Sequence, residues 1–138
     1  MKICYVINKF PLISETFIVE EAMSLETFNV EFFIYALRKG EDSIIHPSTK
    51  SIIEKKPVTY IEEITKYQSL VALFNIFIQK PIHTIDIFRK IKSSPDRWFY
   101  FQALPYALEL IKKNTNYIHA HFADENLYYA FILSEWTN

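Results

Sequence analysis

Glycine is almost absent from this sequence, since Gly40 is the only one among 138 residues. A dinucleotide-binding domain needs a glycine-rich turn after its first strand, because there the backbone approaches the pyrophosphate closely. The segment that follows the first apolar run here, residues 8–14, has no glycine. We therefore expect no cofactor bound by this chain, and in particular no nucleotide held in the usual way.

Cysteine and an excess of charge are missing as well. Cys4 is the only cysteine and lies inside an apolar run, so we expect a buried structural thiol, no internal disulfide and a reducing compartment. Fifteen Lys and Arg residues stand against sixteen Asp and Glu residues. Because no basic excess attracts a phosphate backbone, we do not expect nucleic acid as a partner.

Long hydrophobic runs are also lacking. The apolar residues 3–7 are too few for a signal peptide, and no small-residue cleavage site follows them. The longest apolar stretch, residues 70–78, is interrupted by Asn75 and covers about half of a membrane span. These observations predict a cytoplasmic protein.

The apolar residues that are present indicate an α/β fold. The length predicts a single domain over residues 1–138. Continuous apolar runs are typical of strands buried in a parallel sheet, and helical periodicity separates them here. We predict a Rossmann-like parallel sheet flanked by helices. The predicted strands are residues 3–7, 30–37, 57–61 and 117–122, and the predicted helices are residues 17–28, 48–55, 62–80, a segment from 81, 97–113 with a bend at Pro105, and 127–136.

A sheet wound in this way commonly has the strand order 3-2-1-4. The reversal of direction leaves a crevice at the carboxyl ends of the first and fourth strands, where ligands bind. Residues 8–16 and 119–125 would border that crevice. We therefore expect the binding site to combine these two segments.

Two histidines lie at the end of the fourth predicted strand. His119 and His121 are two residues apart, so their side chains point to the same face of the sheet. Each can hydrogen-bond a backbone carbonyl and stabilise the turn, or contact a substrate as a donor or base. We place His119 deeper in the strand and favour the functional role for His121, which is nearer the strand end.

Three other chemistries are less well supported. Asp124 offers a third metal ligand beside the histidines, but no further Cys or His lies nearby, and we expect no metal site. No nucleophile elbow surrounds Ser14, so a hydrolase triad with His121 is not expected. A flavodoxin-like phosphoacceptor would carry acidic residues after the first strand, where Asn8 and Lys9 stand.

Two segments resemble a known family. Residues 10–18 read FPLISETFI and are similar to the FPxxSETFI stretch of bacterial glycosyltransferases of family 4, of the exopolysaccharide and colanic-acid type. Glu21 matches the glutamate that usually follows in the same helix. Residues 118–123 read IHAHFA and are similar to the family's HAHFA stretch. The order and separation of the two motifs fit the N-terminal domain of that family over the whole chain.

The resemblance implies the N-terminal half of a GT-B fold. In this family the N-terminal domain binds the acceptor, a saccharide or a lipid-linked saccharide, and the C-terminal domain binds the nucleotide-sugar donor. Transfer is metal-independent and retains the anomeric configuration. A donor domain is not found in these 138 residues, so we expect the chain to be inactive without it, and the catalytic residues remain unassigned. The acceptor-binding residues that we predict are Phe10, Ser14, Glu15, Thr16, His119 and His121.

The apolar middle of the chain has three interpretations. Residues 70–78 can be packed between the sheet and other helices, can contact a membrane or a lipid-linked acceptor, or can pack on the missing domain. We favour the first, and we expect the aromatic residues within 94–106 to be core. Basic residues nearby are compatible with peripheral contact at the inner face of a membrane. They are Lys66, Lys80, Arg89, Lys90 and Lys92.

A second function is compatible with the same sequence. The chain can be a non-enzymatic α/β module that binds a glycan, a lipid-linked saccharide or a protein partner. In that case the segment 70–78 would carry the partner contact, and the site at the sheet edge would be dispensable.

Overall fold

Four parallel strands form one sheet in the order β3-β2-β1-β4, as predicted. The strands are β1 (Lys2–Phe10), β2 (Glu31–Lys39), β3 (Thr59–Tyr60) and β4 (Tyr117–Ala120). The structure is a computed structural model that describes residues 1–12, 16–40, 45–56 and 58–138. It confirms the α/β, Rossmann-like fold class.

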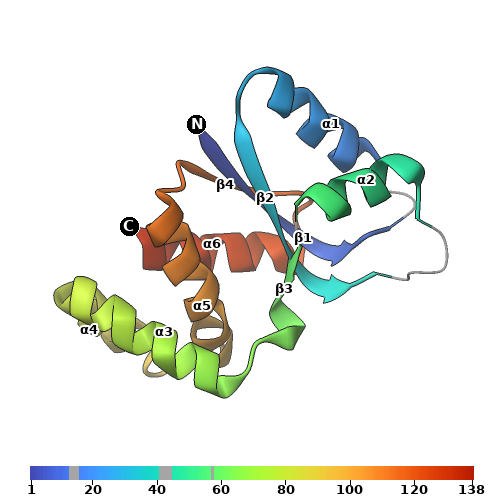
Figure 1. Ribbon diagram of the computed structural model, residues 1–138. Helices are drawn as coiled ribbons and strands as arrows, with labels where there is room; N and C mark the ends of the chain where they lie inside the picture. The colour runs from blue at the N-terminus through green and yellow to red at the C-terminus, as the bar shows by residue number, and fades with distance from the viewer. Residues whose placement is uncertain (13–15, 41–44, 57) are drawn as a thin grey trace.

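Six helices flank the sheet within the described residues (Figure 1). A 3-10 turn, η2 (Ile61–Glu63), follows β3. The helices are α1 (Thr16–Thr27), α2 (Pro47–Lys55), α3 (Lys66–Gln79), α4 (Pro81–Ile91), α5 (Arg97–Lys113) and α6 (Glu125–Thr137). Helix α5 continues through Pro105.

Several element boundaries differ from the prediction, and three of them bear on the site or the surface. Strand β1 continues to Phe10 because it pairs with β2 up to the Phe10–Lys39 register, so the first loop does not begin at Asn8. Helix α3 begins only after Thr65, which forms a capping box with Gln68. Strand β4 ends at Ala120, two residues earlier than expected.

The two faces of β1 contribute to two separate cores. Cys4 and Val6 pack in a cluster with α5 and α6, whereas Tyr5 and Ile7 pack with α1 and α2. Figure 1 shows these helix pairs on opposite faces of the sheet. The Cys4 thiol is fully buried, as predicted, and burial raises its pKa well above the ordinary value.

Helices α3 and α4 lie outside α5 and α6, and their outer surface is apolar. Contrary to the favoured prediction, residues 70–78 are not covered on all sides. Ala72 and Ile76 are buried, but Phe74 is 65% exposed and Ile78 is 62% exposed. The reason is that α3 packs mainly on α5 and α4, so only one face of it is covered. The other exposed large hydrophobic residues of the two helices are Tyr67, Leu70, Val71, Phe77, Ile82, Ile85 and Phe88.

Candidate functional site

The two predicted segments meet at the carboxyl ends of β1 and β4. The backbone N–H of His121 donates to the carbonyl oxygen of Val6 at 3.2 Å, which extends the pairing of the two strands by one hydrogen bond. The side chain of Asn126, at the start of α6, donates to the same Val6 carbonyl at 3.0 Å and also to the carbonyl of His121. Asn126 is fully buried, so it joins strand, turn and helix at this point.

Four side chains form a cluster on the α1 side of this edge. The rings of His119 and His121 are 4.6 Å apart, which confirms that they share one face. Tyr5 stacks on His121 at 5.0 Å, with an interplanar angle of 18°. From α1, Glu21 accepts a hydrogen bond from the Tyr5 hydroxyl at 2.8 Å and places its second carboxylate oxygen 4.0 Å from His121 Nε2. We call these four residues the histidine cluster.

Burial controls the electrostatics of the cluster. The pKa of His121 is lowered from its ordinary value of 6.5 by burial and by the neighbouring His119, and Glu21 opposes this shift. The imidazole of His121 is therefore neutral at pH 7. The pKa of Tyr5 is raised by burial and by its hydrogen bond to Glu21, so the phenol remains a donor.

An NMR titration of the imidazole protons tests this assignment. We expect His121 to titrate below 6.5, and the Glu21→Gln variant to lower its pKa further, since the carboxylate favours the imidazolium. The matched control is Glu20→Gln, an exposed neighbour on α1. A His121 pKa at or above 6.5 would contradict the burial argument, and an effect of Glu20→Gln as large as that of Glu21→Gln would contradict the role of Glu21.

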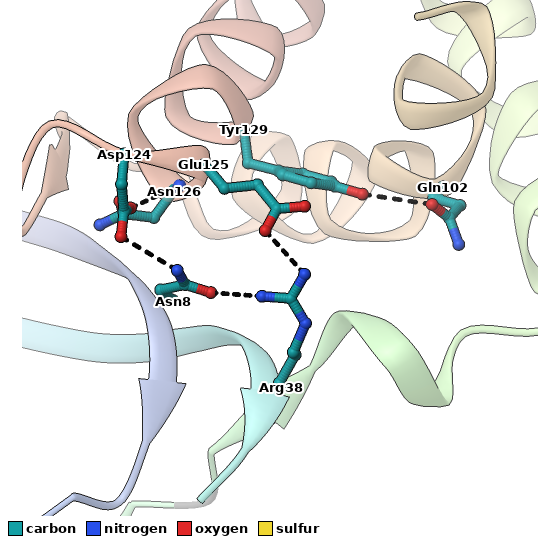
Figure 2. A network of polar contacts seen from close by, with 7 residues as sticks. All are labelled: Asn8, Arg38, Gln102, Asp124, Glu125, Asn126 and Tyr129. Atoms are coloured by element: carbon teal, nitrogen blue, oxygen red, sulfur yellow. Dashed lines mark hydrogen bonds and ion pairs between the residues drawn. The ribbon is translucent and has the colours of Figure 1, made fainter.

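A second polar network joins the ends of β1 and β2 to the start of α6 (Figure 2). Arg38 donates to Asn8 Oδ1 and pairs with Glu125, both at 2.7 Å. Asn8 in turn donates to Asp124 Oδ2 at 3.0 Å, and the other oxygen of Asp124 accepts from the Asn126 N–H at 3.1 Å. The side chain of Arg38 is 50% exposed, so this network is partly open to solvent.

The predicted residues of the first segment have different positions. Phe10 was predicted to bind the acceptor, but it is fully buried in the core with α1 and α2, so its side chain is not accessible to an acceptor in this structure. Ser14 and Glu15 lie outside the described residues. Thr16 begins α1, and the next residue, Phe17, contacts the ring of His121 at 6.1 Å.

The burial of the two histidines is the reverse of the prediction. His119 is exposed and His121 is only 7% exposed, so the expectation that His119 lies deeper is wrong. The reason is that β4 ends at Ala120, so His121 lies in the turn after the strand, where the rings of Tyr5 and Phe17 pack against it. Phe122 follows in that turn with a positive φ of 69°. Its ring centroid lies 5.9 Å from that of Phe17. His119 is thus the more accessible of the two histidines.

Sequence reasoning from the strand pattern missed Arg38 and Asn126. Arg38 stands at the carboxyl end of the second strand, two residues before Gly40, and the rule for parallel sheets could have included that strand end. Asn126 could not have been found, because nothing in the sequence distinguishes an asparagine that bridges two carbonyls from one that faces solvent. Glu21 entered only through the resemblance.

Metal-ligating atoms come together in the histidine cluster. The ligand atoms of Glu21, His119 and His121 all lie within 4.8 Å of one another. Asp124, the third ligand that the sequence offered, caps α6 and binds Asn8 instead. The third member of the set is therefore Glu21.

Known proteins add nothing further to this picture: no family model, no curated protein and no solved structure matches the chain. The fold and the site define a class, an α/β domain with an ionisable cluster at the switch point of a parallel sheet. Among the described residues, no helix has the length and apolarity needed to cross a membrane.

Proposed function

We propose that this chain is the acceptor-binding domain of a retaining glycosyltransferase of family 4. The observation that carries the proposal is the meeting of the two motif segments at one edge of the sheet. Phe17 and Glu21 of the first segment contact His121 of the second across the β1–β4 boundary. This is the position at which parallel α/β sheets bind ligands.

The chemistry of the edge suits a polyhydroxylated ligand. The exposed His119 offers a ring nitrogen and the exposed Glu21 offers a carboxylate, while Arg38 and Glu125 form a partly exposed ion pair at the ends of the strands. Sugar hydroxyls both donate and accept hydrogen bonds, so a mixed set of this kind recognises them well. The glycine-free turn after β1 agrees with a domain that leaves the nucleotide to its partner.

A lipid-linked acceptor is favoured by the surface of α4 and α5. A trough of about 630 Å³ lies between these helices, with Phe88 and Trp98 among its lining residues. The cations Arg89, Lys92 and Arg97 also line it. Apolar walls with positive charge match a lipid tail that carries a phosphate, and they suit contact with anionic lipids at the cytoplasmic face of a membrane.

Sugar transfer would require both this chain and a donor-binding domain. The chain would bind and orient the acceptor hydroxyl, and a donor-binding domain or partner chain would supply the nucleotide sugar. We expect no transfer by residues 1–138 alone and recovery of transfer when a donor-binding domain is added.

The test is a binding titration of the intact chain with one saccharide in free and in lipid-linked form. We expect the lipid-linked form to bind more tightly, and His119→Ala to weaken binding of both forms about tenfold, since each lost hydrogen bond contributes up to about 1.5 kcal/mol. The matched control is His46→Ala, an exposed histidine that caps α2.

Two outcomes would contradict the proposal. Equal weakening by His119→Ala and His46→Ala would show that the edge is not the site. Binding of a protein partner that is lost in Phe74→Ser and retained in His119→Ala would instead support the non-enzymatic module. The observation that favours this second function, a module that binds a protein partner, is the exposed apolar face of α3.

A further inference from the structure

The buried nitrogen of His121 has no hydrogen-bond partner among the described residues. His121 is only 7% exposed, and its Nε2 points toward the Glu21 carboxylate at a distance of 4.0 Å, which is too long for a hydrogen bond. An unpaired polar atom in such a place costs free energy unless a ligand or water satisfies it. The atom therefore indicates a ligand between the two side chains.

From this arrangement we propose that Glu21, His119 and His121 bind a divalent transition-metal ion. Three ligand atoms lie within 4.8 Å of one another, and they comprise two imidazoles and one carboxylate. This is a common set of three protein ligands for an open metal site, in which the fourth position is left to water or substrate. The proposal does not rest on the glycosyltransferase proposal, and the resemblance does not imply it.

Tyr5 orients two of the three proposed metal ligands, Glu21 and His121. Its hydroxyl donates to one oxygen of Glu21, which leaves the other oxygen directed at His121. Its ring stacks on His121 and holds the imidazole plane in one orientation. Groups that orient metal ligands in this way typically account for a 10–100-fold effect on metal affinity.

The three ligand atoms need to move only slightly closer together to bind an ion. Zinc–ligand bonds of about 2.0–2.2 Å put the ligand atoms of a tetrahedral site about 3.4 Å apart. His121 is held by its surroundings, but Glu21 and His119 are exposed and can move inward. Two nitrogen ligands select Zn²⁺, Co²⁺ or Ni²⁺ over Mg²⁺ and Ca²⁺, which prefer oxygen.

A cobalt titration of the intact chain, followed by visible absorption, tests the proposal. We expect one equivalent of Co²⁺ to produce the d–d bands of a low-coordinate site, and Zn²⁺ to displace it. His119→Ala and Glu21→Gln should each weaken Co²⁺ binding at least tenfold, and Tyr5→Phe should weaken it about tenfold. Circular dichroism confirms that each variant is folded before it is titrated.

The controls separate this site from chance binding elsewhere. His46→Ala and His83→Ala, which change the two remaining histidines, should leave Co²⁺ binding unchanged. Excess Mg²⁺ should not compete. Unchanged affinity in both His119→Ala and Glu21→Gln, or loss of binding in His46→Ala, would overturn the proposal, and so would competition by Mg²⁺ at concentrations similar to those of Zn²⁺.

Discussion

We expect the Asn126→Asp variant to be about 3–5 kcal/mol less stable than the parent protein at pH 7. The amide of Asn126 donates to the carbonyl oxygens of Val6 and His121 in a fully buried position. Aspartate has the same shape but no donor, so it would place a negative charge against two acceptors with no water to solvate it. The measurement is the free energy of unfolding from urea denaturation, combined with the His121 signals in NMR.

The pH dependence of this loss follows from the sign of the pKa shift. Burial without a donor raises the pKa of the introduced carboxyl above its unfolded value of about 3.9. The unfolded state then releases its proton first as the pH rises, so the loss grows above about pH 3.9 and reaches its full size once the pH exceeds the raised pKa of the folded state. Relative to the parent, the loss should shrink as the pH falls toward 4.

Asn116→Asp is the matched control for this substitution. Asn116 is exposed, and its side-chain oxygen accepts a hydrogen bond from the Lys2 N–H at 2.8 Å. Aspartate retains that acceptor, so we expect a change within about 0.5 kcal/mol. If the two variants lost the same stability, the bridging role of Asn126 would be wrong.

The Gly40→Ala variant should lose about 2–3 kcal/mol of stability. A Cβ atom built on Gly40 would lie 1.8 Å from the backbone oxygen of Pro11, and backbone cannot move aside as a side chain can. The N–H of Gly40 also donates to the Phe10 carbonyl at 2.9 Å, and this hydrogen bond joins the ends of β1 and β2. Denaturant unfolding measures the loss.

Ser93→Thr serves as the control, because it also adds one carbon atom but at an exposed position. A change within about 0.5 kcal/mol is expected there. The close contact also explains why the only glycine of the chain stands at residue 40. A fully stable Gly40→Ala protein would show that the ends of β1 and β2 can separate without cost, and the path of the chain into the site would need revision.

The fold was largely predictable, because parallel strands that are buried on both faces produce continuous apolar runs. The runs at residues 3–7 and 30–37 became β1 and β2, and the order 3-2-1-4 is the one that sheets wound in this way commonly have. The boundaries were less predictable. Phe10 joined β1 because the ladder with β2 continues, and that depends on the partner strand rather than on local sequence.

The candidate site was predictable in outline. The crevice rule placed residues 8–16 beside residues 119–125, and Asn8 donates a hydrogen bond to Asp124 across them. Phe17 and Glu21, which follow the first segment in α1, lie against His121. The relative depths of His119 and His121 were not predictable, because they depend on where β4 ends and on what α1 covers. The apolar surface of α3 was misjudged for a similar reason, since a helix in an outer layer can be apolar on an uncovered face.

The sequence by itself determined that this is a parallel α/β domain, that its first turn lacks the glycines of a nucleotide site, and that two motif segments can meet at one edge. These properties follow from local composition and from rules that hold for every such sheet. The tertiary structure alone decided that His121 is buried and His119 exposed, that Glu21 faces both, and that Asn126 bridges β1 to the turn after β4. The physical reason is that burial, pKa and ligand geometry depend on distances between residues about 100 positions apart in the chain, and only packing sets those distances.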